Sequence, residues 1–177
     1  MGSCGSKQTI ASEITITVLG NEKSEKATKS LIKLLSNSEE PADFDFKSFN
    51  HDQLIVNIIY SKTDYQYIYS NVWGFLYVID TSDETNDLGQ VKEHLQTIQN
   101  HNPEKAFVVV VNGHTPDMST IRKKLDLKTS IFGRNDIKVV QADLSKKDGD
   151  SAKKALEELI QAITNNYDKI QGVMKPK

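Results

Sequence analysis

The residues best suited to chemistry in this chain stand in the frame of a phosphate-binding loop near its amino terminus. Gly20 follows an apolar run and Lys26 comes six residues later, the spacing that the P-loop pattern G-x-x-x-x-G-K-[ST] gives its first glycine and its lysine. In such a loop, backbone N–H groups surround a phosphate and the lysine contacts its outer oxygens. The rest of the pattern is absent: Glu25 replaces the second glycine, Ala27 replaces the Ser/Thr, and Thr28 stands one residue late.

Two of these replacements oppose the chemistry of the frame. A carboxylate at position 25 would repel a phosphate, since two unit charges about 4 Å apart cost about 4 kcal/mol at an effective dielectric of about 20, close to a thousandfold in affinity. Ala27 lacks the hydroxyl that binds Mg²⁺ in a P-loop. We therefore favour a structural interpretation, in which Gly20 turns the chain off a strand and Lys26 is a solvated helix lysine.

Bulk properties narrow the classes of function. The 177 residues fit one domain, and 22 basic against 24 acidic side chains give a net charge of -2, which argues against binding to nucleic acid. No apolar run approaches the roughly 20 residues of a membrane-spanning helix. The single cysteine, Cys4, excludes an internal disulfide framework and a multi-cysteine metal site, so we expect a reducing cytosolic setting.

The amino-terminal residues, MGSCGSK, match the myristoylation pattern M-G-x-x-x-[ST]. We expect an N-myristoyl group on Gly2. Because one acyl chain gives only reversible membrane binding, we expect an S-palmitoyl group on Cys4 as a second anchor. The alternative is a flexible Gly/Ser segment with a chance match. An acyl group on Gly2 could also enter a groove of a protein partner instead of a membrane.

Hydrophobic periodicity predicts the elements that must position the loop. Strands are expected at residues 13–19, 43–49, 53–60, 72–80, 105–111 and 136–142, and helices at 23–36, from cap residues 81–84 to about Asn100, at 118–125 and at 151–170. The second and third strands are close enough to form an antiparallel hairpin, and the continuous apolar fourth and fifth strands are typical of a parallel centre.

Together these elements predict an α/β fold of three layers (α/β/α), with a six-stranded, mostly parallel sheet and one antiparallel hairpin strand. We expect a single domain over residues 13–172. A flexible, acylated segment (1–12) should precede it and a short tail (173–177) should follow.

This element order, with a P-loop frame after the first strand and a hairpin next, resembles the small GTPase (Ras-like) superfamily. Residues 69–98, YSNVWGFLYVIDTSDETNDLGQVKEHLQTI, are most similar to its Arf-like branch, whose members also carry a myristoylated glycine that corresponds to Gly2. The resemblance covers about residues 13–165. It implies a P-loop GTPase fold and, with it, sites for a guanine nucleotide and Mg²⁺.

The family's other motifs are only partly present. The resemblance aligns its D-x-x-G, which positions Mg²⁺ and the γ-phosphate, with Asn57 to Tyr60, so that both the Asp and the Gly are replaced. The guanine-reading N-K-x-D keeps Asn112, but its Asp becomes Thr115, and Asp117 lies two residues further on. The expected switch I segment contains no threonine. Asn112 could instead cap a turn at the end of its strand.

We therefore predict an Arf-like pseudo-GTPase with no catalytic residues, nucleotide cofactor or metal, acting as a lipid-anchored docking or structural subunit. Its partners would be proteins of a larger assembly, in the cytoplasm, at a membrane periphery or in a cytoplasmic or ciliary-type complex. The alternative is a divergent GTP-binding switch. In that case Gly20, Lys26 and Thr28 would face the phosphates of GTP or GDP with Mg²⁺, and Asn112 with Asp117 would hold the base. A third class, an unrelated α/β enzyme of flavodoxin-like layout, ranks last because no nucleophile–base pair stands at the strand ends.

Overall fold

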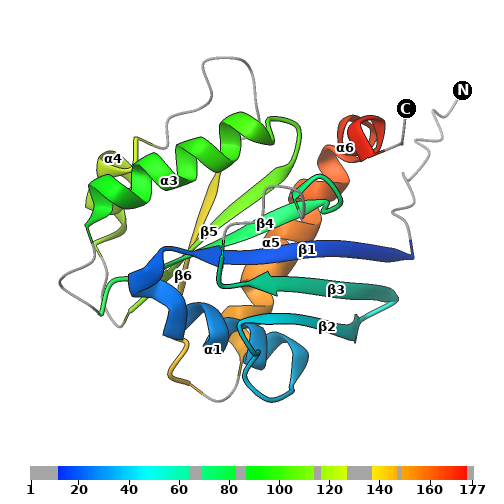
Figure 1. Cartoon of the computed structure of the whole chain (residues 1–177), viewed down its shortest axis with the longest axis horizontal. Helices are drawn as coiled ribbons and strands as arrows, with labels where there is room; N and C mark the ends of the chain where they lie inside the picture. The colour runs from blue at the N-terminus through cyan, green and yellow to red at the C-terminus, as the bar shows by residue number, and fades with distance from the viewer. Residues whose placement is uncertain are drawn as a thin grey trace, which may run out of the picture.

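The computed structural model describes residues 12–63, 69–82, 87–113, 117–126, 137–146 and 149–174, with side chains up to residue 171. Its centre is a six-stranded sheet with the strand order β2-β3-β1-β4-β5-β6 (Figure 1). The strands are β1 (Glu13–Gly20), β2 (Phe44–His51), β3 (Leu54–Ser61), β4 (Gly74–Asp80), β5 (Ala106–Asn112) and β6 (Lys138–Ala142). β2 runs antiparallel to β3, and every other neighbouring pair is parallel, which confirms the predicted sheet.

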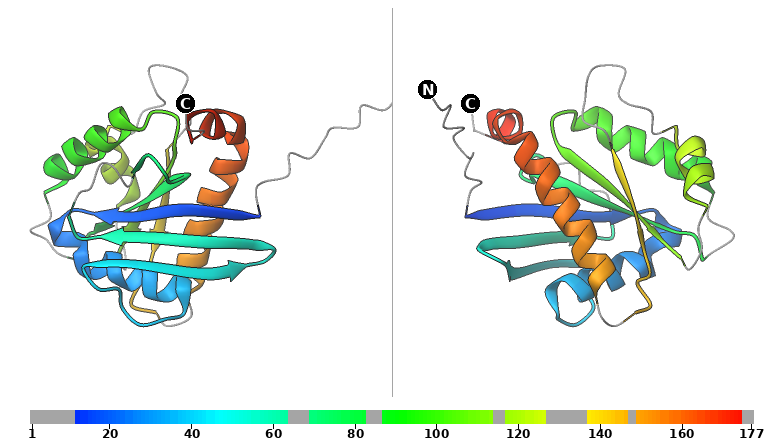
Figure 2. Two further views of the ribbon diagram at one scale, coloured as in Figure 1. Left: turned by 45° about the vertical axis from the view of Figure 1, so that its right-hand side comes forward. Right: turned by 180° about the vertical axis from the view of Figure 1, so that it is seen from behind.

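Helices cover both faces of this sheet, so the predicted three layers are present. α1 (Glu25–Ser36) and α5 (Asp150–Asn165) lie on one face, and α3 (Leu88–His101) and α4 (Met118–Lys124) lie on the other (Figure 2). A short 3-10 helix, η1 (Glu22–Ser24), precedes α1, and α6 (Tyr167–Met174) follows α5. The central strands β4 and β5 are buried on both faces, as expected of parallel strands between two helical layers.

The hairpin of β2 and β3 forms one edge of the sheet. Its register runs without interruption from Phe44 opposite Ser61 to His51 opposite Leu54. Asp52 makes the turn possible with a φ of 53°, a left-handed conformation that Asp tolerates better than most residues. Every second residue of β2 is exposed, so this strand is half-buried where β4 is fully buried.

The predicted closing helix at 151–170 is wrong in one respect, because it divides into α5 and α6 at Asn166. The side chain of Asn166 donates to the carbonyl of Ala162 at 2.8 Å, and its backbone N–H donates to the carbonyl of Ile163 at 3.1 Å. Its own backbone (φ -120°, ψ 14°) leaves the helical region. The break turns α6 so that Tyr167 stacks on Trp73 with ring centroids 5.3 Å apart. α6 also continues to Met174, past the expected domain boundary at residue 172.

The predicted cap of α3 is also wrong. The N-cap of α3 is Asp87, whose carboxylate accepts the N–H of Gly89 at 2.8 Å. Of the expected cap residues, Thr81 and Ser82 instead bond to the ends of β5 and β4. In the described part of the chain, no helix combines the length and the apolar character that crossing a bilayer requires.

Candidate functional site

The phosphate-loop frame lies at the carboxyl edge of the sheet, where β1 ends at Gly20 and the chain winds through η1 into α1. The backbone N–H of Ser24 donates to the carbonyl of Asn21 at 2.9 Å, and the N–H of Glu25 donates to the carbonyl of Glu22. These are the two N–H groups directly before Lys26, where a P-loop needs donors that point at a phosphate. In the 3-10 turn these two N–H groups therefore bond to carbonyl groups of the protein, whereas in a P-loop they bond to the phosphate.

Buried side chains also form hydrogen bonds inside this loop. The hydroxyl of Ser24 is fully buried, accepts the N–H of Asp80 at 3.0 Å and donates to the Asn21 side chain at 2.6 Å. Thr28 is buried as well and donates to the carbonyl of Ser24 at 2.9 Å. A Cβ atom on Gly20 would lie 2.6 Å from the Thr28 hydroxyl, so the glycine serves close packing of α1 against β1.

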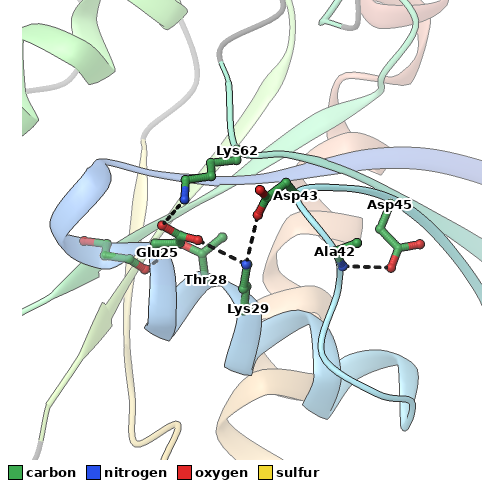
Figure 3. A network of polar contacts seen from close by, with 8 residues as sticks. Glu25, Thr28, Lys29, Ala42, Asp43, Asp45 and Lys62 are labelled. Atoms are coloured by element: carbon green, nitrogen blue, oxygen red, sulfur yellow. Dashed lines mark hydrogen bonds and ion pairs between the residues drawn. The ribbon is translucent and has the colours of Figure 1, made fainter.

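A charged cluster joins the start of α1 to the hairpin (Figure 3). The carboxylate of Glu25 pairs with Lys29 at 3.0 Å and with Lys62 at 3.2 Å, and Lys29 also pairs with Asp43 at 3.3 Å. Hydrogen bonds from Lys29 and then from Lys62 hold the pKa of Glu25 below its usual value. The bond to Glu25 raises the pKa of Lys29, although partial desolvation opposes that rise. We call these four residues the Glu25 clasp.

The clasp connects three segments that small GTPases organise around the nucleotide. Lys29 belongs to α1, Asp43 immediately precedes β2, and Lys62 immediately follows β3. In GTPases, contacts from the γ-phosphate and Mg²⁺ order the corresponding switch segments. Here a carboxylate of the protein itself supplies the negative charge between two ammonium groups. Lys26, the lysine of the predicted motif, is exposed on α1 and is not one of the two lysines that pair with Glu25.

Asn112 joins the carboxyl ends of three neighbouring strands through hydrogen bonds. Its side-chain amide donates to the carboxylate of Asp80 at 3.0 Å and accepts the N–H of Leu144 at 3.0 Å, which ties the end of β5 to the end of β4 and to the loop after β6. Its backbone carbonyl accepts both the N–H and the hydroxyl of Thr81, at 2.9 and 2.7 Å. The polar atoms that would meet a guanine base are therefore bonded within the protein.

Asp117, the other residue predicted for the base, is the N-cap of α4. Its carboxylate accepts the backbone N–H and the hydroxyl of both Ser119 and Thr120, over distances of 2.6 to 3.1 Å. The Thr120 hydroxyl contributes most to lowering the pKa of Asp117 to about 2. Asp117 thus serves its own helix, because these contacts hold its carboxylate at the first turn of α4.

The alignment of Asn57 with the aspartate of D-x-x-G is wrong. Asn57 pairs with Thr15 in the amino-terminal half of β1, and β3 continues four residues further, to Ser61. The Asn57 amide donates to Glu13, far along the strand from Gly20. The residues at the carboxyl end of β3 are instead Ser61 and Lys62, neither of which can replace the aspartate. Asn57 therefore lies inside the strand, away from the carboxyl edge of the sheet where the D-x-x-G motif of the family stands.

Sequence reasoning missed four residues that define this site. Lys62 has no motif signal, because only the fold brings it to Glu25, whereas Lys29 stands four residues after Glu25 on α1, a spacing that the sequence shows. The other two, Ser24 and Asp80, stand at ends of elements where a buried polar residue is expected to bond locally. Gly2 and Cys4 lie outside the described residues. No group of three potential metal ligands gathers within the ranges that the structure describes.

Comparison with solved structures identifies the architecture. The Arl6 (BBS3) small GTPase of Trypanosoma brucei, solved with the nucleotide analogue GppNp, matches with a TM-score of 0.67 over 87% of this chain and 99% of that chain. The chain has the small GTPase fold. The sequence identity is 13%, so this similarity establishes the fold alone. The chemistry of the site has to be argued from its own residues. No protein-family model matches the sequence, and the search of curated proteins found no match.

Within the small GTPase fold, the departures of this chain gather at the edge where GTPases bind nucleotide. The two loop N–H groups are used internally, the second glycine is a paired glutamate, and Asn112 is bonded to Asp80 and Leu144. The fold is retained around a loop in which the N–H groups of Ser24 and Glu25 are already bonded.

Proposed function

We propose that this protein is an Arf-like pseudo-GTPase, a non-catalytic docking subunit that keeps one fixed conformation. The observation that carries this proposal is the internal use of the loop donors: the N–H groups of Ser24 and Glu25 are bonded within η1. A nucleotide would have to unwind that turn before any phosphate could bind. It would also have to displace the carboxylate of Glu25 from Lys29 and Lys62.

The Glu25 clasp supports the fixed conformation. Only seven residues, 37–43, connect α1 to β2, and Asp43 at their end is paired with Lys29. In a GTPase this region changes between ordered and released states with the nucleotide. Here the protein's own charges perform the ordering, so the surface offered to a partner does not depend on GTP.

The docking surface in this proposal is the face of the hairpin opposite α1. Phe44, Phe46, Ile55 and Ile59 share this face, since Phe46 lies opposite Ile59 and Ile55 opposite Asn50 in the register. Phe44 is 60% exposed, Phe46 55% and Ile55 40%. We call these four residues the hairpin patch. Clustered exposed apolar side chains of this kind are typical of protein interfaces.

Lipid anchoring at Gly2 and Cys4 completes the proposal. β1 starts at Glu13 and ends at Gly20, so an anchor before residue 13 enters the domain at the end of β1 opposite the closed loop. The hairpin patch would then face a protein partner beside a membrane or within a cytoplasmic assembly. The match of the amino-terminal residues to the pattern M-G-x-x-x-[ST] supports the acyl group on Gly2.

Nucleotide titration tests the central claim. Fluorescent GDP and GTP analogues should show no saturable binding to the purified full chain, with or without Mg²⁺. Micromolar or tighter binding would overturn the proposal and return the divergent GTP-binding switch as the better account. A loop variant, Glu25→Gly with Ala27→Ser, supplies the comparison, because it restores the motif residues without touching the hairpin patch. Unchanged thermal stability on adding GTP to the natural chain should accompany the absence of binding.

A further inference from the structure

The outer edge of β2 is long and regular. β2 has eight residues, and its ladder with β3 is continuous from Phe44 to His51, with no bulge. It contains no proline, and in Figure 2 it forms the outer strand of the sheet. Edge strands are usually shortened, bulged or covered because an open edge pairs readily with another strand. This edge is neither short nor bulged, and its two charged residues, Asp45 and Lys47, are paired with each other.

The backbone groups that face outward can be assigned. The N–H of Lys62 donates to the carbonyl of Asp43 at 2.7 Å, and bonding to the neighbour alternates along an antiparallel strand. The odd-numbered residues of β2 therefore bond to β3, and residues 44, 46, 48 and 50 direct their backbone groups outward. All four are exposed. In agreement, the N–H of Phe46 bonds to the side chain of Asp45 at 2.8 Å.

We propose that β2 pairs antiparallel with β2 of a second copy of this chain, with Phe46 on the two-fold axis. In this register Phe46 lies opposite Phe46 of the second copy, and Asp45 lies opposite Lys47 of the second copy. The symmetry repeats the Asp45–Lys47 pair, so opposite charges meet twice on one face of the joined sheet while two phenylalanine rings meet on the other. Directly opposite pairs of both kinds stabilise sheets.

Neighbouring registers are less complementary. A two-fold axis at Asp45 places two carboxylates opposite each other, and an axis at Lys47 places two ammonium groups opposite each other. An axis at Ser48 sets Phe46 opposite Asn50 and Asp45 opposite His51. Like charges directly across a ladder are destabilising. The charge pattern of the strand thus selects the Phe46 axis.

The side chain of Asp45 bonds a backbone N–H group at the free edge of β2, and pairing with a second copy would replace that bond. Its carboxylate binds Lys47 at 3.0 Å and accepts the N–H groups of Phe46 at 2.8 Å and Ala42 at 3.3 Å. On pairing, the Phe46 N–H would donate to the Phe46 carbonyl of the second copy, and the carboxylate oxygen it leaves would face the second Lys47. No backbone donor loses its partner in this exchange. The hairpin patches of the two copies would become one continuous apolar surface.

Charge reversal tests the partner and the register together. We expect the full chain to sediment as a dimer as its concentration rises. Asp45→Lys or Lys47→Asp alone should weaken the dimer roughly tenfold or more, because each places like charges opposite one another twice. The double variant, Asp45→Lys with Lys47→Asp, should restore it. Lys123→Asp on exposed α4 is the matched control and should leave the dimer unchanged.

Cross-linking provides a second readout, in a Cys4→Ser background. Phe46→Cys should form a disulfide-linked dimer, since Cα atoms of a hydrogen-bonded antiparallel pair lie about 5.5 Å apart, within disulfide range. Asn50→Cys should not, because the two copies of residue 50 would lie roughly 27 Å apart at about 3.4 Å per residue. A chain that stays monomeric at all concentrations, a dimer indifferent to the single reversals, or a cross-link at residue 50 would each refute the proposal. If the chain stays monomeric and the Phe46 variant no longer binds some other protein, the partner of this edge is that protein and not a second copy of the chain.

Discussion

Replacing Glu25 with glutamine removes the charge of the Glu25 clasp while keeping the shape of the side chain. The pair with Lys29 is an i,i+4 helix pair at 3.0 Å, and the pair with Lys62 spans 3.2 Å with that lysine half-exposed. Helix pairs of the first kind contribute about 0.3–0.5 kcal/mol, and exposed pairs of the second kind about 0.2–1 kcal/mol. Glu25→Gln should therefore lower the free energy of unfolding by about 0.5–1.5 kcal/mol.

Urea unfolding at neutral pH and low ionic strength measures this difference. A double-mutant cycle with Lys62→Met isolates the longer-range pair, whose coupling should disappear at about 1 M salt, where the screening length falls to about 3 Å. Glu22→Gln, an exposed glutamate in η1, is the matched control and should change stability little. Equal stability of Glu25→Gln and the natural chain, or a coupling that persists in high salt, would refute the clasp.

The same variant has a defined pH dependence. Because Lys29 and Lys62 lower the pKa of Glu25 in the folded state, its contribution is complete above the unfolded value of 4.5 and is lost as the pH falls through the folded value. The gap in stability between the natural chain and Glu25→Gln should therefore close on acidification below about pH 4. A gap that widens there would contradict the assigned sign.

Three further predictions follow from other features. Gly20→Ala should cost about 1–3 kcal/mol of stability, since the new methyl group would meet the Thr28 hydroxyl at 2.6 Å, and Thr28→Ala in the same chain should recover part of that loss in thermal melts. Burial lowers the pKa of Lys105 from 10.5 to about 8, so the cost of burying its charge is complete below that pH and relieved above it. Urea unfolding should show the natural chain gaining about 2 kcal/mol relative to Lys105→Met between about pH 7.5 and about pH 9.5, whereas a fall would reverse the linkage. Intact mass of the protein from cells able to myristoylate should include a myristoyl group, which Gly2→Ala removes; an unmodified natural chain would end the anchoring proposal.

The fold could be predicted from the sequence because its signals are local and redundant. The apolar runs of β4 and β5 and the alternation in β2 each identify their strands without reference to the rest of the chain. The break at Asn166 could not be predicted in this way, because one asparagine in an amphipathic pattern is compatible with a continuous helix. Its consequence depends on Trp73, which is distant in sequence and stacks on Tyr167.

The candidate site was less predictable, because its contacts join distant segments. The sequence shows that Glu25 replaces a glycine, but not that Lys62 lies beside it, thirty-seven positions later. It shows a serine at position 24, but not that its hydroxyl receives the N–H of Asp80. The place of Asn57 could not be predicted for a related reason, since it depends on the register between β1 and β3. The sequence shows which residues are present, whereas the contacts between residues distant in sequence depend on the fold.

The position of β1 also has a mechanical consequence. β1 is an interior strand, hydrogen-bonded to β3 on one side and to β4 on the other, and parallel to both. Tension applied before Glu13 along the strand would load both ladders in shear, so that many hydrogen bonds must break together. Tension on an outer strand such as β6 could peel one ladder bond by bond. A tether at the amino end therefore pulls on the part of this domain best arranged to resist force.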